Sequence, residues 1–361
     1  MSRIMGPART LAAALAVAAA LTGAAGCGGG NGNGGSNSGS SSSSGGNSQN
    51  SKVKKVAFFG FASANSFAQA TWAGVQQAAK KYGAQAKFFD PNFDAQKQVS
   101  QMQDALTTQQ YQLFVVQAND GNAVVPAIKQ AIGQGVTVVA EFTPVGSKYD
   151  TIQPQVPKMI FVGEAPVDNG HKLGQLGVAA CKGLNPCNVA YLQGFKALPL
   201  DNARTDAVMQ TLKTASNVKV VASPEGGYTQ ASGLKATQDV LSAHPNVNVI
   251  IGSAQAIEGA QQAVKGAGKL PSSPADLKKP STIKLIGNGG SCQAVKAVNA
   301  GQWFAAYVAA ERSAGEKATE LGIQAANGKQ VPPAFNTQQL QEPLGTRSVL
   351  QKTGFKGQYC D

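Results

Sequence analysis

Short runs rich in Val, Ile and Phe alternate with longer amphipathic stretches through most of this chain. Short continuous apolar runs are typical of parallel strands buried on both faces, and amphipathic stretches are typical of the helices that connect them. Nine strands are predicted, at 55–59, 86–89, 113–116, 136–140, 159–162, 189–192, 219–222, 249–251 and 284–286. The pattern therefore predicts an α/β fold, built on a parallel sheet with helical crossovers.

Helices are predicted between these strands, among them 66–82 and 95–109, and a late helix is predicted at 311–327. Gly83 and Gly328 follow two of them, and glycine commonly ends a helix because it adopts the left-handed backbone conformation. From Ser51 onward about 310 residues remain, enough for two domains that each have a core.

The N-terminus is typical of an exported protein. Basic residues precede an apolar run at 11–21 that is too short to span a bilayer. Small residues then lead to Cys27, similar to the lipobox at which bacterial lipoproteins are cleaved and acylated, although Ala24 stands where the lipobox usually has Leu. We predict a signal peptide at 1–26, lipidation of Cys27 and a flexible Gly/Ser/Asn tether at 27–51. Secretion without a lipid is the alternative.

The rest of the chain has no run that is long and apolar enough to cross a membrane. We therefore expect a folded body outside the cytoplasm, held at the outer face of the cytoplasmic membrane by the lipid, or periplasmic. The net charge of +12 comes from scattered lysines without a basic block interleaved with aromatic residues, which disfavours nucleic-acid binding. A basic surface facing anionic lipid or cell wall is the favoured interpretation.

Four cysteines follow Cys27, an even number that favours disulfides in an oxidising compartment. Three pairings are possible among Cys181, Cys187, Cys292 and Cys360. The turn-rich stretch 182–186 favours the pairing of Cys181 with Cys187, which leaves Cys292 with Cys360. The cysteines lack the close spacing of zinc ligands and no histidine adjoins them, so no metal is predicted.

Ligands of open parallel sheets bind beyond the carboxyl ends of the strands, so the residues after each predicted strand are candidates for a binding site. They are mostly amides, hydroxyls and aromatic rings, which suit a neutral polar ligand held between rings. The candidates are Asn65, Phe67, Gln117, Phe142, Thr143, Tyr228, Ser253, Gln255 and Asn288. The alternative is that some of these residues only form turns and helix caps.

An ordered series of short motifs between 53 and 345 resembles the type I periplasmic binding proteins. The motifs lie at 65–67, 72–75, 120–124, 167–170, 192–194, 243–247 and 297–301. In this family two doubly wound domains are joined by a three-crossover hinge and trap the ligand by hinge closure. The resemblance implies an N-terminal lobe at 52–164 plus 310–337 and a C-terminal lobe at 165–309 plus 338–361.

The resemblance also implies roles for single residues. It implies ligand contacts for Asn65 and Gln117, stacking for Phe67 and Tyr228, and a grip on hydroxyls or a carboxylate for Arg204. For Arg204 the alternative is a surface ion pair with a neighbouring aspartate, at 201 or 206.

Several positions depart from the family pattern. Where the family has a second Phe, an Asp-Arg pair, an Asp and a Gln, this chain has Ala68, Phe142-Thr143, Gly289 and Ala309. Sugar hydroxyls without partners would be buried at a cost of about 1–3 kcal/mol each. We therefore expect a ligand that is larger or less hydroxylated than a free pentose, such as a nucleoside-like or modified sugar.

These features together predict a solute-binding lipoprotein that delivers a small polar ligand to an ABC-type importer. A ligand sensor for a membrane kinase or chemoreceptor is the alternative. An enzyme is disfavoured because His171 and His244 have no evident nucleophile beside them. Glu141 and Glu258 are expected to be a cleft hydrogen-bonder and a solvated helix charge. We predict a monomer without a cofactor.

Overall fold

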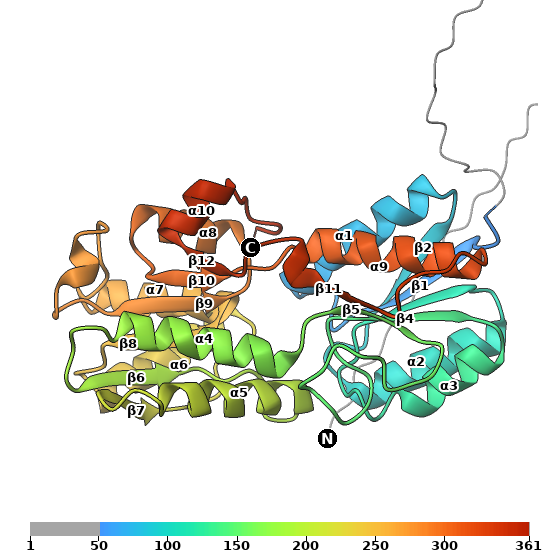
Figure 1. Ribbon diagram of the computed structural model, residues 1–361. Coiled ribbons are helices and arrows are strands. Elements are labelled where there is room, and N and C mark those ends of the chain that lie inside the picture. Colours follow the sequence, from blue (N-terminus) through green and yellow to red (C-terminus); the bar gives the residue numbers. More distant parts are fainter. Residues whose placement is uncertain (1–50, 361) are drawn as a thin grey trace, which may run out of the picture. The chain divides into compact units, whose positions relative to one another are not determined.

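The computed structural model describes residues 51–360. The predicted signal peptide, Cys27 and nearly all of the predicted tether lie outside the described residues. Two six-stranded sheets organise the described part of the chain (Figure 1). The first sheet has the order β11-β5-β4-β3-β1-β2 and the second has the order β12-β10-β9-β8-β6-β7. Within each sheet the central strands are parallel to their neighbours, as predicted.

The strands of the first sheet are β1 (Lys55–Phe59), β2 (Gln85–Phe89), β3 (Leu113–Val116), β4 (Thr137–Glu141), β5 (Ile160–Gly163) and β11 (Ala334–Asn336). Those of the second sheet are β6 (Cys187–Tyr191), β7 (Val218–Ala222), β8 (Val249–Ser253), β9 (Lys284–Asn288), β10 (Ala305–Tyr307) and β12 (Leu344–Thr346). All nine predicted strands form, with ends that differ by a few residues.

Helices cover both faces of each sheet, because successive strand residues point to opposite faces and both sets are apolar. On the first sheet, α1 (Ser66–Lys81) and α9 (Glu311–Ala326) pack on one face, while α2 (Ala95–Thr108) and α3 (Val125–Gly133) pack on the other. The second sheet carries α4 (Pro166–Ala180) and α5 (Pro199–Leu212) on one face. Its other face carries α6 (Gln230–Ala243), α7 (Ala254–Gly266), α8 (Cys292–Ala300) and α10 (Arg347–Thr353).

The chain passes between the two sheets three times. It leaves the first sheet after β5, returns after β10 to add α9 and β11, and leaves again through a 3-10 turn, Thr337–Gln339, to reach β12. The sequence analysis did not predict β10, β11 or β12, because each has three residues and shows no clear periodicity. Among the pairings within residues 51–360, only that of β10 with β12 is antiparallel.

Both predicted disulfides form. Cys181 is bonded to Cys187 with a Cα–Cα distance of 5.5 Å, and Cys292 is bonded to Cys360 with a Cα–Cα distance of 5.0 Å. The second bond ties the end of the described chain to the start of α8. Within residues 51–360, no helix combines the length and the apolar character needed to cross a bilayer.

Helices α1 and α9 lie side by side (Figure 1) and approach each other at two glycines. A Cβ atom on Gly74 would lie 1.9 Å from the carbonyl oxygen of Arg312, and one on Gly315 would lie 2.1 Å from that of Thr71. Only glycine permits this backbone contact. The contact holds α9, which arrives by the second crossing, against the first sheet.

We expect Gly315→Ala to lower the free energy of unfolding by about 1–3 kcal/mol, because the added methyl group forces two packed backbones apart. Urea unfolding followed by circular dichroism measures the change. Gly133→Ala is the matched control, since a Cβ atom there meets nothing within 4 Å. An equal loss of stability in the two variants would contradict this account of the α1–α9 contact.

Candidate ligand-binding cavity

A cavity lies at the carboxyl ends of the strands and takes its walls from both sheets and their connections. Eight of the ten predicted ligand-binding residues line it. They are Asn65, Phe67, Phe142, Thr143, Arg204, Tyr228, Gln255 and Asn288. The rule that ligands bind beyond the strand ends therefore brings most of these residues to one place.

Gln117 and Ser253 do not line this cavity. Gln117 is fully buried and donates hydrogen bonds through Nε2 to Thr71 Oγ1 at 3.1 Å and to Glu141 Oε2 at 2.8 Å. Ser253 caps α7: its hydroxyl accepts from the N–H of Ala256 at 3.1 Å and donates to the carbonyl of Gly227 at 2.7 Å. Both side chains hold neighbouring segments in place.

Six aromatic rings line the cavity, of which Phe61, Phe93 and Tyr307 are not among the predicted residues. The centroids of the Phe67 and Phe142 rings are 4.8 Å apart, and the Phe93 ring is stacked 6.0 Å from that of Tyr228. Phe93 and Phe142 have φ values of 60° and 64°, a left-handed conformation that is costly for a bulky residue. These two rings point into the cavity from loops, and hydrophobic periodicity in the sequence does not predict the direction of a loop side chain.

Arg204, on α5, is the centre of a buried polar cluster. Its Nη1 donates to Asp201 Oδ1 at 2.9 Å and its Nε donates to Asn169 Oδ1 at 2.6 Å, while the Tyr228 hydroxyl also donates to Asp201 Oδ1. Arg204 is 5 % exposed and Asp201 is 2 % exposed. The alternative for Arg204, an ion pair with a neighbouring aspartate on the surface, is therefore wrong in one respect. The ion pair with Asp201 exists, but it is buried.

The charge of Arg204 is maintained by this cluster. Burial alone would lower the pKa of Arg204, but Tyr228 and Asp201 raise it by a larger amount, so the guanidinium stays protonated. Asn288 and Asn169 add two reciprocal amide hydrogen bonds, at 3.2 and 3.3 Å. The cluster thus presents a positioned cation and amide to the cavity.

Three buried side chains of the cavity wall have polar atoms with no hydrogen-bond partner among residues 51–360. These atoms are Oδ1 and Nδ2 of Asn119, Oγ1 of Thr143 and Oε2 of Glu311. A buried polar group without a partner costs about 1–3 kcal/mol, so native proteins rarely keep several together. Their arrangement suits a polar ligand that supplies the missing donors and acceptors. Asn119 and Glu311 are not among the predicted ligand-binding residues.

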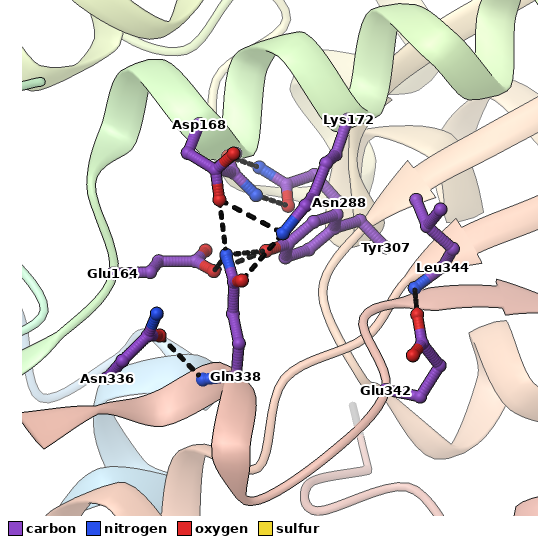
Figure 2. Close-up of polar contacts among 10 residues, drawn as sticks. Glu164, Asp168, Lys172, Asn288, Tyr307, Asn336, Gln338, Glu342 and Leu344 are labelled. Atoms are coloured by element: carbon purple, nitrogen blue, oxygen red, sulfur yellow. Dashed lines mark hydrogen bonds and ion pairs between the residues drawn. The ribbon is translucent and has the colours of Figure 1, made fainter.

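The three crossings between the sheets meet in one polar cluster (Figure 2). Gln338, on the third crossing, donates through Nε2 to Asp168 Oδ2 at 2.6 Å and to Glu164 Oε2 at 3.1 Å, both at the first crossing. Lys172 donates to Gln338 Oε1 at 2.6 Å, and the hydroxyl of Tyr307, at the second crossing, donates to Glu164. Glu164 and Tyr307 also line the cavity, so this crossover cluster borders the site.

The remaining candidates for chemistry are held by structural contacts. His171 Nδ1 is 2.9 Å from Thr211 Oγ1, and neither histidine lines the cavity. Glu141 is buried against Gln117 and does not line the cavity either. The expectation of a solvated charge at Glu258 is wrong: it is 7 % exposed and accepts from Gln230 Nε2 at 2.9 Å and from the Ser291 hydroxyl at 2.7 Å.

Comparison with known families and proteins agrees with this architecture. A family model described as a periplasmic binding protein domain matches residues 56–330. The ribose import binding protein of Escherichia coli (strain K12) is 25% identical over 265 residues, which cover 73% of this chain and 81% of that protein. The D-allose-binding periplasmic protein of the same organism is 27% identical over 146 residues, or 40% of this chain and 44% of that protein.

Solved structures share the fold. A solute-binding protein from Mycobacterium smegmatis with bound glycerol has a TM-score of 0.69 and 21% identity, covering 86% of this chain and 99% of that one. The Caulobacter myo-inositol binding protein bound to myo-inositol has a TM-score of 0.69 and 18% identity, covering 82% and 95%. These identities are low, so the two likenesses concern the fold alone.

The buried carboxyl of Glu141 makes stability depend on pH. Burial, together with the nearby Glu311, raises the pKa of Glu141 from 4.5 to about 8, and the hydrogen bond from Gln117 opposes the shift. The folded protein therefore holds a proton that the unfolded chain releases, so this contribution to stability is full below pH 4.5 and is lost as pH rises through about 8. We expect Glu141→Gln to make the decline in unfolding free energy between pH 5 and 9 less steep, as measured by urea unfolding.

Glu342→Gln is the control, because this carboxyl is exposed and, among residues 51–360, accepts a hydrogen bond from the N–H of Leu344 at 3.4 Å (Figure 2). It should leave the wild-type pH profile unchanged. A Glu141→Gln profile as steep as that of the wild type would contradict the assignment.

Proposed function

The chain belongs to the type I periplasmic binding protein family, and from this premise we propose that it captures a sugar-like ligand outside the cytoplasm and delivers it to an ABC-type importer. The observation that carries this proposal is the cavity wall. Buried atoms of Asn119, Thr143 and Glu311 that have no hydrogen-bond partner among residues 51–360 face the same cavity as six aromatic rings. Sugars and cyclitols match both features of this wall. Their apolar C–H faces can pack against the rings, and their hydroxyls can hydrogen-bond with the polar atoms.

The relatives support a ligand of this class. Two of them are named for ribose and D-allose, and solved structures of the same fold hold D-allose and myo-inositol. Phe142-Thr143 and Ala309 nevertheless remove hydrogen-bonding groups that the family usually has at these positions. The ligand we propose is therefore larger or less hydroxylated than a free pentose. The proposed contacts are the eight predicted residues that line the cavity, together with Asn119 and Glu311.

Ligand capture is proposed to work by hinge closure. The cavity takes residues from both lobes, and Gln255 Nε2 donates to Ser66 Oγ at 3.1 Å from one lobe to the other. A ligand that contacts both lobes stabilises the closed form over the open one, and the importer recognises the closed form. Binding is favoured over turnover. Glu164, an acid of the cavity wall, already accepts hydrogen bonds from Tyr307 and Gln338 and is therefore engaged in structural contacts.

Titration calorimetry against D-ribose, D-allose, myo-inositol and adenosine tests the proposed function. At least one of the last three should bind, and Phe67→Ala should weaken that binding about tenfold, because the variant loses a stacking ring worth about 1.4 kcal/mol. Phe335→Ala is the matched control, since this ring lies on β11 and does not line the cavity. If nothing in the panel binds, the proposed function is wrong; if only ribose binds, the proposed ligand size is wrong.

We further propose that Cys27 carries a lipid that holds the protein at the outer face of the cytoplasmic membrane, as its lipobox-like surroundings indicate. The full chain expressed in a bacterial host should partition into the detergent phase of Triton X-114. Cys27→Ser should move it to the aqueous phase, whereas Ser36→Ala in the tether should not. Detergent partitioning that persists in Cys27→Ser would disprove the anchor at this residue.

A further inference from the structure

Glu311 stands apart from the other ionisable groups of the cavity. It begins α9 directly after the second crossing, is 2 % exposed and lines the cavity. Its Oε1 accepts from the N–H of Gly290 at 3.2 Å, while Oε2 has no hydrogen-bond partner among residues 51–360. Neither the strand-end rule nor the family resemblance points to this position, which lies two residues after Ala309.

The cavity has more acids than bases. Three acids line it, namely Glu164, Asp201 and Glu311, against one cation, Arg204. Asp201 is bonded to Arg204 and Tyr228, and Glu164 accepts from Tyr307 and Gln338. A fourth acid, Glu141, is close enough to Glu311 for the charge of Glu311 to raise its pKa. Glu311 is therefore the acid whose free oxygen a ligand can contact.

We propose that Glu311 determines specificity by accepting a hydrogen bond from an amino group, so that the site prefers amino-bearing sugars or cyclitols over neutral ones and rejects sugar acids. The inference rests on the proposed function, because it requires this cavity to be the ligand site. An ammonium group forms a charge-assisted hydrogen bond with a carboxylate, and the aromatic rings of the wall can contact its remaining surface. The one cation among the described residues that line the cavity, Arg204, is already paired with Asp201, so the desolvation of an anion is only partly compensated.

The protonation of Glu311 offers a second readout. Burial, together with the nearby Glu164, raises the pKa of Glu311 to about 8, and hydrogen bonds from its own N–H and that of Gly290 oppose the shift. The carboxyl is therefore mostly protonated at pH 7 without ligand. A bound ammonium stabilises the carboxylate, so binding an amine at pH 7 should release a proton to the buffer. Binding a neutral sugar should not.

A purely structural role is the competing explanation. An acid in the first turn of a helix stabilises it through the helix dipole, and Glu311 has this position in α9. Such a role affects unfolding but not the order in which ligands bind. Selectivity and proton release therefore distinguish the two roles.

The experiment is titration calorimetry of the full chain at pH 7 with D-glucose, D-allose, D-glucosamine and D-glucuronate, in two buffers of different ionisation enthalpy. The wild type should bind the amine at least tenfold more tightly than the neutral hexoses and release a proton with it, and bind the acid at least tenfold more weakly. Glu311→Gln should lose the proton release and about tenfold of the preference for the amine. The deciding quantity is the ratio of amine affinity to neutral-hexose affinity, because Glu311 also contacts neutral sugars in the proposed site.

Two further variants complete the test. Glu316→Gln, on the same helix and outside the cavity, should behave as the wild type. Glu311→Asp keeps the carboxyl group but shortens the side chain. It should weaken amine binding and still reject the acid. This variant replaces Glu311→Gln in the test if Glu311→Gln does not fold. Wild-type selectivity and proton release in the folded Glu311 variants would overturn this inference alone. A wild type that binds none of the four sugars would overturn it together with the proposed function for these hexoses.

Discussion

The side chain of Gln338 connects all three crossings of the chain between the two sheets. One amide donates to carboxylates of the first crossing and accepts from Lys172, and Tyr307 of the second crossing completes the cluster through Glu164. An amide suits this position because it donates and accepts at once without adding charge. Hydrogen bonds to charged partners are stronger than those between neutral groups, so this cluster defines where the lobes are joined.

The crossover cluster also reaches the ligand site. Glu164 and Tyr307 belong to both, and Glu311 begins the helix that follows the second crossing. In the proposed hinge closure, a ligand that contacts these residues therefore also contacts the segments that bend. Because Glu164 and Tyr307 belong to both the cavity wall and the crossover cluster, ligand binding can be coupled to the hinge through them.

Much of the framework was predictable because its signals are local. Buried parallel strands appear as apolar runs, and the nine runs between 55 and 286 all form strands. The three-residue strands β10, β11 and β12 are too short to carry such a signal. β10 and β11 pair with the edges of the longer strands β9 and β5, and β12 then pairs with β10. The pairing of Cys181 with Cys187 was predictable from a short turn-rich loop, and the second disulfide followed by elimination.

The cavity was predictable in outline and not in detail. Thr143, Phe142 and Asn288, to which the strand-end rule points, line the cavity, but Gln117 follows a strand as well and is instead held between Thr71 and Glu141. Both environments suit an amide, so residue type does not distinguish them. Phe61 and Phe93 come from loops, where no periodicity marks the direction of a side chain.

The sequence by itself determined the fold class, the order of strands and helices, the disulfides and the expectation of an exported binding protein, since these depend on local patterns and motifs. Only the tertiary structure decided which polar atoms of the cavity stay without partners and which acids are neutralised. Asp201 and Glu311 are both buried carboxyls, yet one is paired with Arg204 and the other keeps a free oxygen. That difference arises from contacts between residues far apart in the chain, which no local pattern records.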